Sequence, residues 1–400
     1  MNIQAITVIN QSHLNHLLKE INVDKAAIDI MSAKAVSQVI RIKKVPSWIA
    51  NILKQEMLSL NADVAVNRDA ITGRAKFSDC LVMGNLSQLN RFVEKLEKQP
   101  ASLKKISGQI KNLLENYARQ EFILLLKNSQ MKLGRRTKLM AIVNLTPDSF
   151  SGDGLWGKVD LDFIYRHIDG LVKDGADIID IGGESTRPGA KPVSLKDEIN
   201  RTIPVIKKIA KKINLPLSID TYKPEVARMA LDCGASIVNN VMGVQNNPKM
   251  LKVIKKERAA VVLMHIKGKP QTMQKKPCYQ DLMGEILESL KKSMDIAVSF
   301  GINPEKIIVD PGIGFAKTKE QNLEIIRRLA ELRSLGRPIL IGPSRKSFIG
   351  KILNLEPQER LMGTAAAVVT SIVNGANIVR VHDCRAIKQV VKITNSILYN

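Results

Sequence analysis

One stretch of the chain, residues 177–189, joins a short apolar run to a polar loop; its sequence is DIIDIGGESTRPG. The isoleucines at its start are β-branched and form a run too short for a helix, which predicts a buried strand. Gly182 and Gly183 end this strand and allow a sharp turn. The loop then carries a carboxylate, two hydroxyls and a guanidinium, as is typical of strands that present chemical groups at their carboxyl ends. The same residue types also occur in ordinary surface turns. Whether this loop carries chemical groups therefore depends on whether the pattern of a short apolar strand followed by polar residues repeats along the chain.

The layout does repeat, because seven further short apolar runs end in a polar residue or a glycine. Helix-like segments at residues 161–173, 195–212, 282–300, 321–335 and 359–374 separate most of them. Ser194 and Thr318 are predicted N-caps, with Asp197 and Gln321 three residues further on. Eight such units in about 260 residues predict a (β/α)8 TIM barrel, whereas a doubly wound sheet usually has fewer strands. The predicted strands are residues 139–143, 178–181, 216–219, 236–238, 260–264, 306–309, 339–341 and 377–381.

In such a barrel, the residues that directly follow the strands meet at one face, however far apart they lie in the sequence. These residues are mostly polar, whereas a rim that serves only stability has no need of so many polar groups. The set is Asn144, Thr146 and Asp148; Ser185, Thr186 and Arg187; Asp220; Asn239 and Asn240; His265 and Lys267; Asp310, Phe315 and Lys317; Ser344, Arg345 and Lys346; Arg380, His382 and Asp383.

The charges of this set predict a site with two ends. Arg187, Arg345, Lys346, Arg380 and His382 suit phosphate or carboxylate oxygens. An asparagine oxygen, from Asn144, suits a magnesium ion that keeps waters and substrate phosphates as its other ligands. The aspartates after the third and sixth strands suit a polar heterocycle with N–H groups or a developing cation. The sequence therefore predicts a pocket for a pyrophosphate and a planar, nitrogen-rich ring.

A structural explanation competes with this one at the last strand. Arg380 and Asp383 by themselves are also compatible with an ion pair that serves only stability, beside a buried His382. The rim carries neither a Ser-His-Asp arrangement nor a Cys-His nucleophile.

Composition narrows the class of protein. The formal charge is +23, and the excess is spread along the chain, since residues 1–137 hold 21 Lys/Arg and 11 Asp/Glu and the remainder holds 40 and 27. With 4% aromatic residues there is little for bases to stack on, which disfavours nucleic acid as the main ligand. The four cysteines lie far apart without a C-x-x-C pair, which favours a reducing cytoplasm. We expect neither a signal peptide nor a membrane span.

Residues 1–130 are predicted to form a separate, small α/β domain whose role the sequence does not reveal. Residues 131–138 are basic and polar and are predicted to be a linker, with the barrel at residues 139–400. The expected strands of the first domain are residues 3–9, 36–42, 63–66 and 80–83, and its expected helices are residues 11–21, 46–60, 87–97 and 107–126.

Six motifs, in order along residues 138–398, resemble those of the dihydropteroate synthase family, a family of pterin-binding TIM barrels. A seventh segment, MHIKGKPQTMQ, is similar to the family's fifth-strand region, and the first domain takes no part in the resemblance. Several motifs of this length are far more specific than a lone glycine fingerprint. The motifs are NLTPDSFSGDG (144–154), DIGGESTRPGA (180–190), SIDTYKPEVA (218–227), DPGIGFAK (310–317), GPSRKSFIG (342–350) and RVHD (380–383).

The resemblance implies a transferase of folate biosynthesis. It would condense 6-hydroxymethyl-7,8-dihydropterin pyrophosphate with p-aminobenzoate, giving 7,8-dihydropteroate and pyrophosphate, by ionising the C–O bond before the arylamine attacks. Asn144 would ligate Mg²⁺, and Thr186, Arg380 and His382 would hold the pyrophosphate. A homodimer is expected because relatives commonly form one.

The resemblance also implies which residues bind the two organic substrates. Asp220, Asp310 and Lys346 would be catalytic, with the two aspartates stabilising the cation. The pterin would be held by Asp220, Asn239, Asp310 and Lys346. The p-aminobenzoate would be held by Phe150, Thr186, Arg187, Pro188, Phe315, Ser344 and Lys346.

The sequence departs from the family pattern at three places. Asn240 stands where an aspartate is usual, residues 151–154 read SGDG in place of SDGG, and Ile313 and Ala316 replace the more common Phe or Gly. Two alternative functions follow from the same residues. A pterin-dependent corrinoid methyltransferase would share the pterin-holding residues but has no use for the S-R-K and R-V-H segments. A non-catalytic pterin-binding protein would have no use for the pyrophosphate set.

Overall fold

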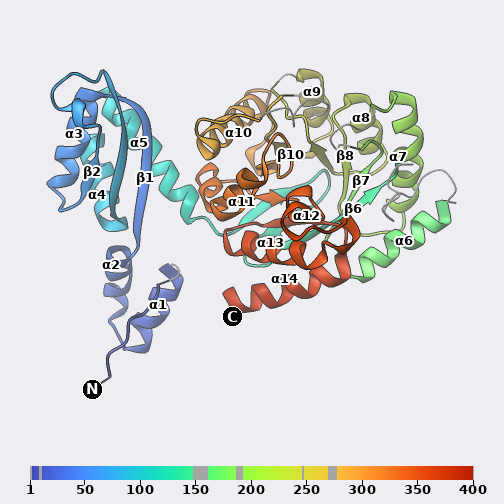
Figure 1. Cartoon of the computed structure of the whole chain (residues 1–400), viewed down its shortest axis with the longest axis horizontal. Helices are drawn as coiled ribbons and strands as arrows, with labels where there is room; N and C mark the ends of the chain where they lie inside the picture. Colours follow the sequence, from blue (N-terminus) through green and yellow to red (C-terminus); the bar gives the residue numbers. More distant parts are fainter. Residues whose placement is uncertain are drawn as a thin grey trace. The chain divides into compact units, whose positions relative to one another are not determined.

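The computed structural model describes residues 2–8, 11–146, 161–185, 192–245, 247–268 and 277–399. The chain divides into two compact units, residues 1–115 and 116–400. Each unit has its own hydrophobic core, and Figure 1 gives the positions of their elements along the chain.

The first unit is built on a three-stranded antiparallel sheet in the order β1-β3-β2. Helices α3 and α4 bury apolar side chains such as Leu53, Met57, Leu89 and Phe92 in the core of this unit. The elements are α1 (Gln11–Glu20), α2 (Lys25–Ala35), β1 (Ser37–Pro46), α3 (Ser47–Leu58), β2 (Asp63–Ala65), β3 (Phe77–Asn85), α4 (Leu86–Glu97) and α5 (Ala101–Ala118).

Two expectations for this region are wrong. A strand is expected at residues 3–9, but the described part of this range, residues 3–8, has no regular structure; helix α2 is not expected from the sequence. The expected helix over 107–126 ends at Ala118, and residues 122–125 are a strand instead. Phe122 and Leu125 fit the spacing of the preceding helix, but both pair with β5, and Leu124 between them packs against the barrel.

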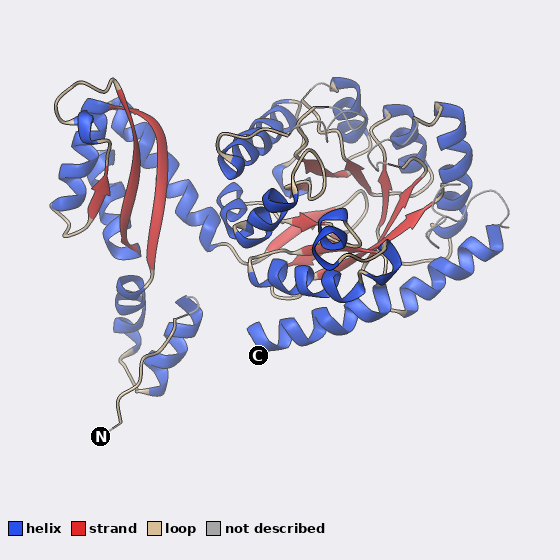
Figure 2. Cartoon of the chain, in the orientation of Figure 1, coloured by secondary structure: helices blue, strands red, loops and turns tan. Residues whose placement is uncertain are grey.

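The second unit is a closed barrel of eight parallel strands, which confirms the predicted (β/α)8 fold. The sheet has the order β11-β10-β9-β8-β7-β6-β13-β12, and a parallel bridge between Val309 and Ile339 closes it. In Figure 2 the red strands lie inside a ring of blue helices. The strands are β6 (Lys138–Asn144), β7 (Ile178–Gly182), β8 (Leu217–Asp220), β9 (Ile237–Asn240), β10 (Ala260–Met264), β11 (Ile307–Asp310), β12 (Leu340–Ile341) and β13 (Ile378–Val381).

The helices outside the barrel begin where the caps predict. Ser194 accepts from the backbone N–H of Asp197 and caps α7, and Thr318 with Gln321 forms a capping box at α11. The helices are α6 (Leu161–Lys173), α7 (Leu195–Ile209), α8 (Pro224–Asp232), α9 (Pro248–Lys256), α10 (Leu282–Ser299), α11 (Lys319–Arg327), α12 (Ser347–Leu353), α13 (Leu361–Val373) and α14 (Cys384–Tyr399), with a 3-10 helix at Leu329–Leu335. Among the described residues, none of the helices is both long enough and apolar enough to cross a membrane.

An antiparallel hairpin, β4 (Phe122–Leu125) and β5 (Gln130–Leu133), lies against the amino-terminal ends of the barrel strands. Leu124, Leu126 and Leu133 pack there with strand residues such as Ile178 and Ile237. Strand β5 occupies part of the segment that the sequence suggested as a linker. Since the hairpin covers this end of the barrel, the carboxyl ends of the strands are the end at which a site is expected.

Candidate active site

The carboxyl ends of the barrel strands surround a cavity of about 370 Å³. Six of the eight strands, all but β9 and β10, contribute residues to its wall at or just beyond their carboxyl ends. Predicted residues from distant parts of the sequence therefore meet in one place. The lining residues are Ile142, Asn144, Thr146, Glu184, Ser185, Asp220, Gly314, Phe315, Gly342, Ser344, Arg345, Lys346, Ser347, Pro357, Arg360, Arg380 and His382.

Arg380 joins this cavity to two buried carboxylates. Its Nε donates to Asp180 Oδ2 at 2.6 Å, and its second terminal nitrogen donates to Asp220 Oδ2 at 2.8 Å. The Asp180 side chain is fully buried and the Asp220 side chain nearly so. The cation offsets the cost of burying both negative charges, which is severe for unpaired carboxylates. Arg380 thus belongs to the acidic and to the basic part of the site.

Asp220 keeps one oxygen available for a ligand. Within the described part of the chain, its buried Oδ1 has no hydrogen-bond partner. Burial raises the pKa of this carboxyl, while the Arg380 charge lowers it. A buried acceptor without a donor is costly, so an N–H group supplied by a bound molecule would stabilise this site.

Asp310 lies at the end of β11 and is also buried. Its Oδ1 accepts from the backbone N–H of Gly312 at 2.7 Å. Burial raises the pKa of Asp310 to about 6, although this hydrogen bond and the charges of Lys346, Lys317 and Arg380 oppose the rise. Asp310 is not among the residues that line the cavity, although the charges of the cavity residues Lys346 and Arg380 lower its pKa.

Lys346 and Phe315 form a further part of the wall. The Lys346 ammonium lies over the Phe315 ring, 4.4 Å from its centroid. Gly314 leaves room for the lysine stem, because a Cβ at this position would lie 3.0 Å from Lys346 Cδ. Gly312 allows a closer approach still, since its Cβ would lie 2.1 Å from the backbone oxygen of His265. The glycines of the DPGIGFAK segment are therefore required by the close packing of the loop.

The segment after β12 is tied to the segment after β13. Ser344 Oγ and His382 Nδ1 are 3.0 Å apart, and the backbone N–H of His382 donates to Ser344 Oγ. Arg345 binds both oxygens of Asp383, at 3.0 and 2.5 Å. The structural alternative, an Arg380–Asp383 ion pair, is therefore wrong, because Asp383 pairs with Arg345 and Arg380 points to Asp180 and Asp220.

The two asparagines after β9 have different surroundings. Asn239 donates to Asp180 Oδ2 at 3.1 Å, so it shares this carboxylate with Arg380. Asn240 accepts from the backbone N–H of Met242 and donates to the carbonyl of Gly243. An aspartate at position 240 has no N–H group that could donate to the carbonyl of Gly243. The asparagine that replaces the usual aspartate therefore stabilises the turn at residues 240–243. Neither asparagine lines the cavity.

His265 and Lys317 form a buried pair outside the cavity wall. Lys317 Nζ lies 3.1 Å from His265 Nδ1 and donates to the carbonyl of Phe315. Burial lowers the pKa of Lys317 to about 7, and burial together with the lysine charges lowers the pKa of His265 to about 3. Lys267 is directed elsewhere, to Glu285 and the carbonyl of Cys278. These three rim residues support the loops rather than the cavity.

Three residues with a role at the site were not among the predicted ones. Asp180 could be identified from the sequence, because it is a charged residue inside an otherwise apolar strand. Glu184 lies in the motif DIGGESTRPGA, but the sequence predicted no role for it. Arg360 lies outside every motif; it lines the cavity and donates to the carbonyls of Arg345 and Leu355. The predicted residues Phe150, Thr186, Arg187 and Pro188, and Asp148 of the rim, lie outside the described residues.

The donors available for a metal are few. Among the described residues, no three His, Cys, Asp or Glu side chains form a cluster that could hold a metal ion. Asn144 lines the cavity. A Cβ added to Gly182 would lie 3.8 Å from Asn144 Oδ1 and 3.8 Å from Asp220 Oδ2, so these two side chains lie near each other. One amide oxygen fits a magnesium ion whose other ligands are waters and substrate phosphates, and does not fit a dedicated protein cage.

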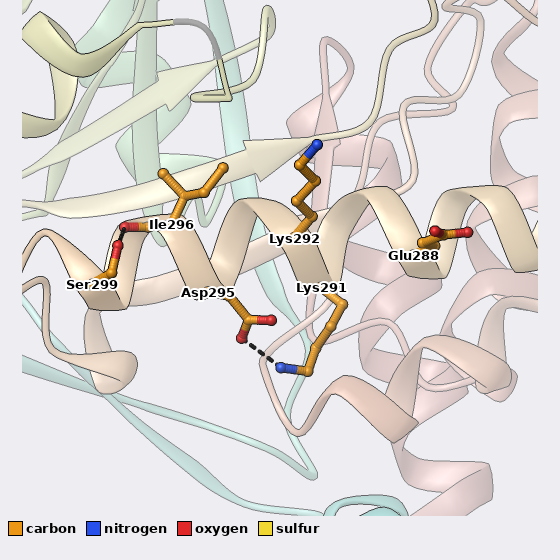
Figure 3. A pocket seen from close by; sticks show the side chains of 6 residues that line it. All are labelled: Glu288, Lys291, Lys292, Asp295, Ile296 and Ser299. Atoms are coloured by element: carbon orange, nitrogen blue, oxygen red, sulfur yellow. Dashed lines mark hydrogen bonds and ion pairs between the residues drawn. The ribbon is translucent and has the colours of Figure 1, made fainter.

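A second hollow, on helix α10, has a different character (Figure 3). Its volume is about 480 Å³, but all six lining residues belong to one helix, and Lys291 and Asp295 pair with each other across one turn. Five of the six side chains are exposed. Without convergent buried polar groups, it offers no chemistry comparable to the barrel cavity.

The barrel matches a known family over most of its length. Residues 140–382 match the family described as "Pterin binding enzyme". The dihydropteroate synthase of Synechocystis sp. is 49% identical over 265 residues, which are 66% of this chain and 91% of that protein. The chain belongs to the dihydropteroate synthase family. The resemblance in the sequence motifs is thereby confirmed.

Solved structures of dihydropteroate synthases agree with this assignment. The Yersinia pestis enzyme in complex with a sulfonamide drug is 36% identical, with a TM-score of 0.67, and the match covers 70% of this chain and 100% of that one. The Burkholderia cenocepacia enzyme complexed with 7,8-dihydropteroate is 35% identical, with a TM-score of 0.63 and coverage of 70% and 98%. As a dihydropteroate synthase, the chain is an enzyme of folate biosynthesis that joins a dihydropterin pyrophosphate to p-aminobenzoate.

Proposed function

We propose that this dihydropteroate synthase is Mg²⁺-dependent and separates charge across its cavity. Arg380 carries the proposal, because it lies between two buried carboxylates and the cavity. Loss of pyrophosphate from the substrate leaves positive charge on the pterin methylene and negative charge on the leaving group. The transition state is stabilised most when fixed groups of opposite sign already face those two ends.

The pyrophosphate end comprises Arg380 and His382, with Thr186 from the neighbouring loop. Arg380 and His382 line the cavity, and the Ser344–His382 contact holds the imidazole in place. Asn144 would hold the magnesium ion. When bound, the ion would supply positive charge to the departing pyrophosphate oxygens.

The pterin end comprises Asp220, Asn239, Asp310 and Lys346. The unpartnered Oδ1 of Asp220 suits an N–H donor of the pterin ring. The two aspartates also stabilise the methylene cation, and Lys346 lies close enough to both to affect their pKa values. Asp220, Asp310 and Lys346 are thus the proposed catalytic residues.

The p-aminobenzoate would be held by Phe315, Ser344 and Lys346, which line the cavity, with Phe150, Thr186, Arg187 and Pro188 from the two loops. Its amine nitrogen attacks the pterin methylene carbon. Before this attack, the C–O bond breaks and its electron pair leaves with pyrophosphate. The C–N bond then forms with the nitrogen lone pair, and a proton of the resulting ammonium leaves to water. We infer further that the enzyme is a cytoplasmic homodimer, with its catalytic barrel at residues 139–400 and a separate domain that ends before the β4–β5 hairpin.

Incubation of the purified chain with the pterin pyrophosphate and p-aminobenzoate, with and without EDTA, tests this proposal. With magnesium, dihydropteroate and pyrophosphate should form in equal amounts. EDTA should lower the rate at least about tenfold, because one protein oxygen binds the ion weakly and leaves it removable. Excess Mg²⁺ should restore the rate. Full activity in EDTA contradicts the magnesium requirement, and the absence of dihydropteroate contradicts the reaction itself.

A further inference from the structure

The loop between β12 and α12 holds one of its residues in an unusual backbone conformation. Arg345 has a φ of 54°, in the left-handed region that residues with a side chain rarely adopt. Its neighbours Ser344 and Lys346 line the cavity, as Arg345 itself does. Residues other than glycine keep such a conformation only where the surrounding structure fixes it. The contacts that fix Arg345 therefore also shape this side of the cavity.

Both polar backbone groups of Arg345 are bound by residues at the start of helix α13. Its N–H donates to Thr364 Oγ1 at 3.0 Å, and its carbonyl accepts from Arg360 Nη1 at 3.0 Å. Thr364 is fully buried in α13, and Arg360 directly precedes that helix. These two contacts, from Thr364 and Arg360, are called the backbone clamp. The peptide groups on either side of Arg345 cannot rotate without breaking one of its two hydrogen bonds.

The guanidinium of Arg360 is held closely on its other side. Its Nε donates to the carbonyl of Leu355 at 2.9 Å, and Gly350 of α12 lies against it. A Cβ added to Gly350 would lie 2.3 Å from Arg360 Nη2 and 2.5 Å from Arg360 Nε, which is too close for a contact between real atoms. Arg360 can thus reach the carbonyl of Arg345 only because residue 350 has no side chain.

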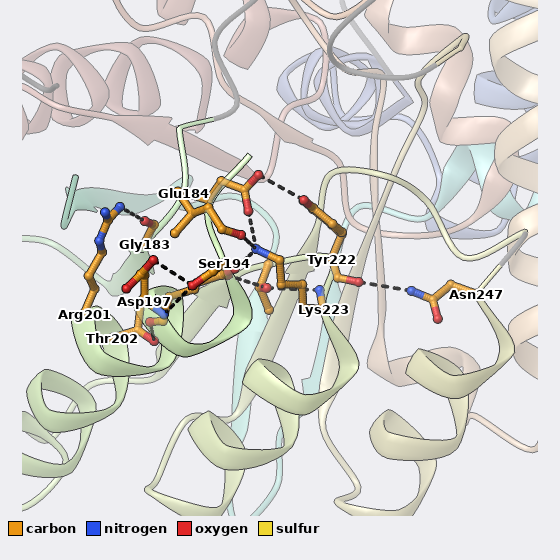
Figure 4. Close-up of polar contacts among 12 residues, drawn as sticks. Gly183, Glu184, Ser194, Asp197, Arg201, Thr202, Tyr222, Lys223 and Asn247 are labelled. Atoms are coloured by element: carbon orange, nitrogen blue, oxygen red, sulfur yellow. Dashed lines mark hydrogen bonds and ion pairs between the residues drawn. The ribbon is translucent and has the colours of Figure 1, made fainter. Parts of the chain in front are cut away.

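The side chain of Arg345 adds a further anchor, because it binds both oxygens of Asp383. Figure 4 shows a different kind of support at another residue of the cavity wall, Glu184, whose carboxylate is bound by Tyr222 and Lys223. There, one side chain is held by others. The backbone clamp acts on the main chain instead, so it affects the side chains on both sides of Arg345 at once.

The backbone of Arg345 sets the directions of the side chains before and after it. Ser344 Oγ lies 3.0 Å from His382 Nδ1, and the Lys346 ammonium lies 4.4 Å from the centroid of the Phe315 ring. All four of these residues line the cavity. Rotation of the peptide groups of Arg345 would move both side chains, and a displacement of about 1 Å can lower the rate of an enzyme about 100-fold.

We propose that Arg360 is a positioning residue for the reaction. It holds the carbonyl of Arg345 and thereby places the side chains of Ser344 and Lys346. The inference rests on the proposed function, which assigns both side chains to p-aminobenzoate and Lys346 also to the pterin and to catalysis. It deepens that function, because Arg360 lies outside every motif that resembles the family. Loss of its contact with Arg345 weakens p-aminobenzoate binding and slows the reaction while the barrel stays folded.

Gly350→Ala tests the proposal without removing any group that forms these contacts. The new Cβ displaces the Arg360 guanidinium from the carbonyl of Arg345, while alanine is a better helix former than glycine within α12. In folded enzyme, the KM for p-aminobenzoate should rise about fivefold or more, and kcat should fall about tenfold or more. A loss of folded protein alone would lower the apparent kcat and leave KM unchanged.

Gly170→Ala is the matched control. Gly170 also lies within a helix, α6, but a Cβ there would have no other element of the described part of the chain within 4 Å. This variant should keep kcat and both KM values within about twofold of wild type. Arg360→Met removes the guanidinium itself and should change kcat and KM in the same directions as Gly350→Ala.

Wild-type kinetics in Gly350→Ala, or in a folded Arg360→Met variant, would overturn the proposal. Changes of equal size in Gly170→Ala would overturn it as well, because they would show an effect of any helix substitution. Wild-type enzyme in the same assay tests the reaction itself, so a failure of the proposed function is recognised separately.

Discussion

Replacing Arg380 by alanine is expected to lower the rate of dihydropteroate formation by about a thousandfold or more. The change removes the cation from the leaving group, an effect of the size seen when an arginine is withdrawn from a phosphate-transfer site. It also leaves Asp180 and Asp220 without their shared partner, so one of them takes up a proton and no longer faces the pterin as an anion. Steady-state kinetics with both substrates at saturation measures the loss.

The same variant should be less stable near neutral pH, by about 3–5 kcal/mol, because a buried ion pair has lost one member. Burial raises the pKa of Asp220 in the folded protein, and the positive charge of Arg380 lowers it. In Arg380→Ala this charge is gone, so the pKa of Asp220 should rise further. A carboxyl whose pKa is higher in the folded than in the unfolded state binds more protons when the protein is folded. Its unfavourable contribution to the free energy of unfolding therefore becomes smaller as the pH falls through the folded-state pKa. Urea unfolding at pH 8 and pH 6 should therefore show a smaller deficit at pH 6.

Arg328→Ala is the control for this stability effect. Arg328 pairs with Glu324 and Glu331 at a partly exposed position, so its loss should cost no more than about 1 kcal/mol. A deficit for Arg380→Ala that is the same at both pH values, or no larger than that of the control, would show that the two aspartates do not depend on this cation.

Asp220→Asn is expected to lower kcat by about 100- to 1,000-fold and to change KM by no more than about threefold. The amide keeps the size of the side chain and an acceptor oxygen but has no charge to stabilise the cation. The fold should tolerate the change, since Arg380 keeps its bond to Asp180. Asp177→Asn, at the opposite end of β7 where the carboxylate binds Lys138 and Lys388, should retain activity within about twofold. Equal losses in kcat and affinity for Asp220→Asn would contradict the role in cation stabilisation.

The barrel could be predicted from sequence because each strand is a short apolar run with a polar residue at its end. The site residues could be collected for the same reason, since the ends of parallel strands meet whatever their distance in sequence. Asn144, Asp220 and Arg380 all follow this rule and line one cavity.

The pairing of charges within the site could not be predicted. Sequence distance suggested Asp383 as the partner of Arg380, whereas the barrel curvature brings Asp180 and Asp220, 200 and 160 positions away, to its guanidinium. Strand β4 could not be predicted because Phe122 and Leu125 continue a helical spacing, whereas both are extended through antiparallel pairing with β5. No sequence pattern around Arg360 indicates its role, because it donates hydrogen bonds to the carbonyls of Leu355 and Arg345.

Opposite charges in one cavity should allow the C–O bond to ionise before the amine attacks. Positional isotope exchange tests it most directly, with ¹⁸O in the bridging position of the pterin pyrophosphate and no p-aminobenzoate present. Wild-type enzyme should move the label into the non-bridging oxygens of recovered substrate, and Asp220→Asn should not. If wild-type enzyme makes dihydropteroate yet leaves the label in the bridge, the C–O bond does not ionise before the amine attacks.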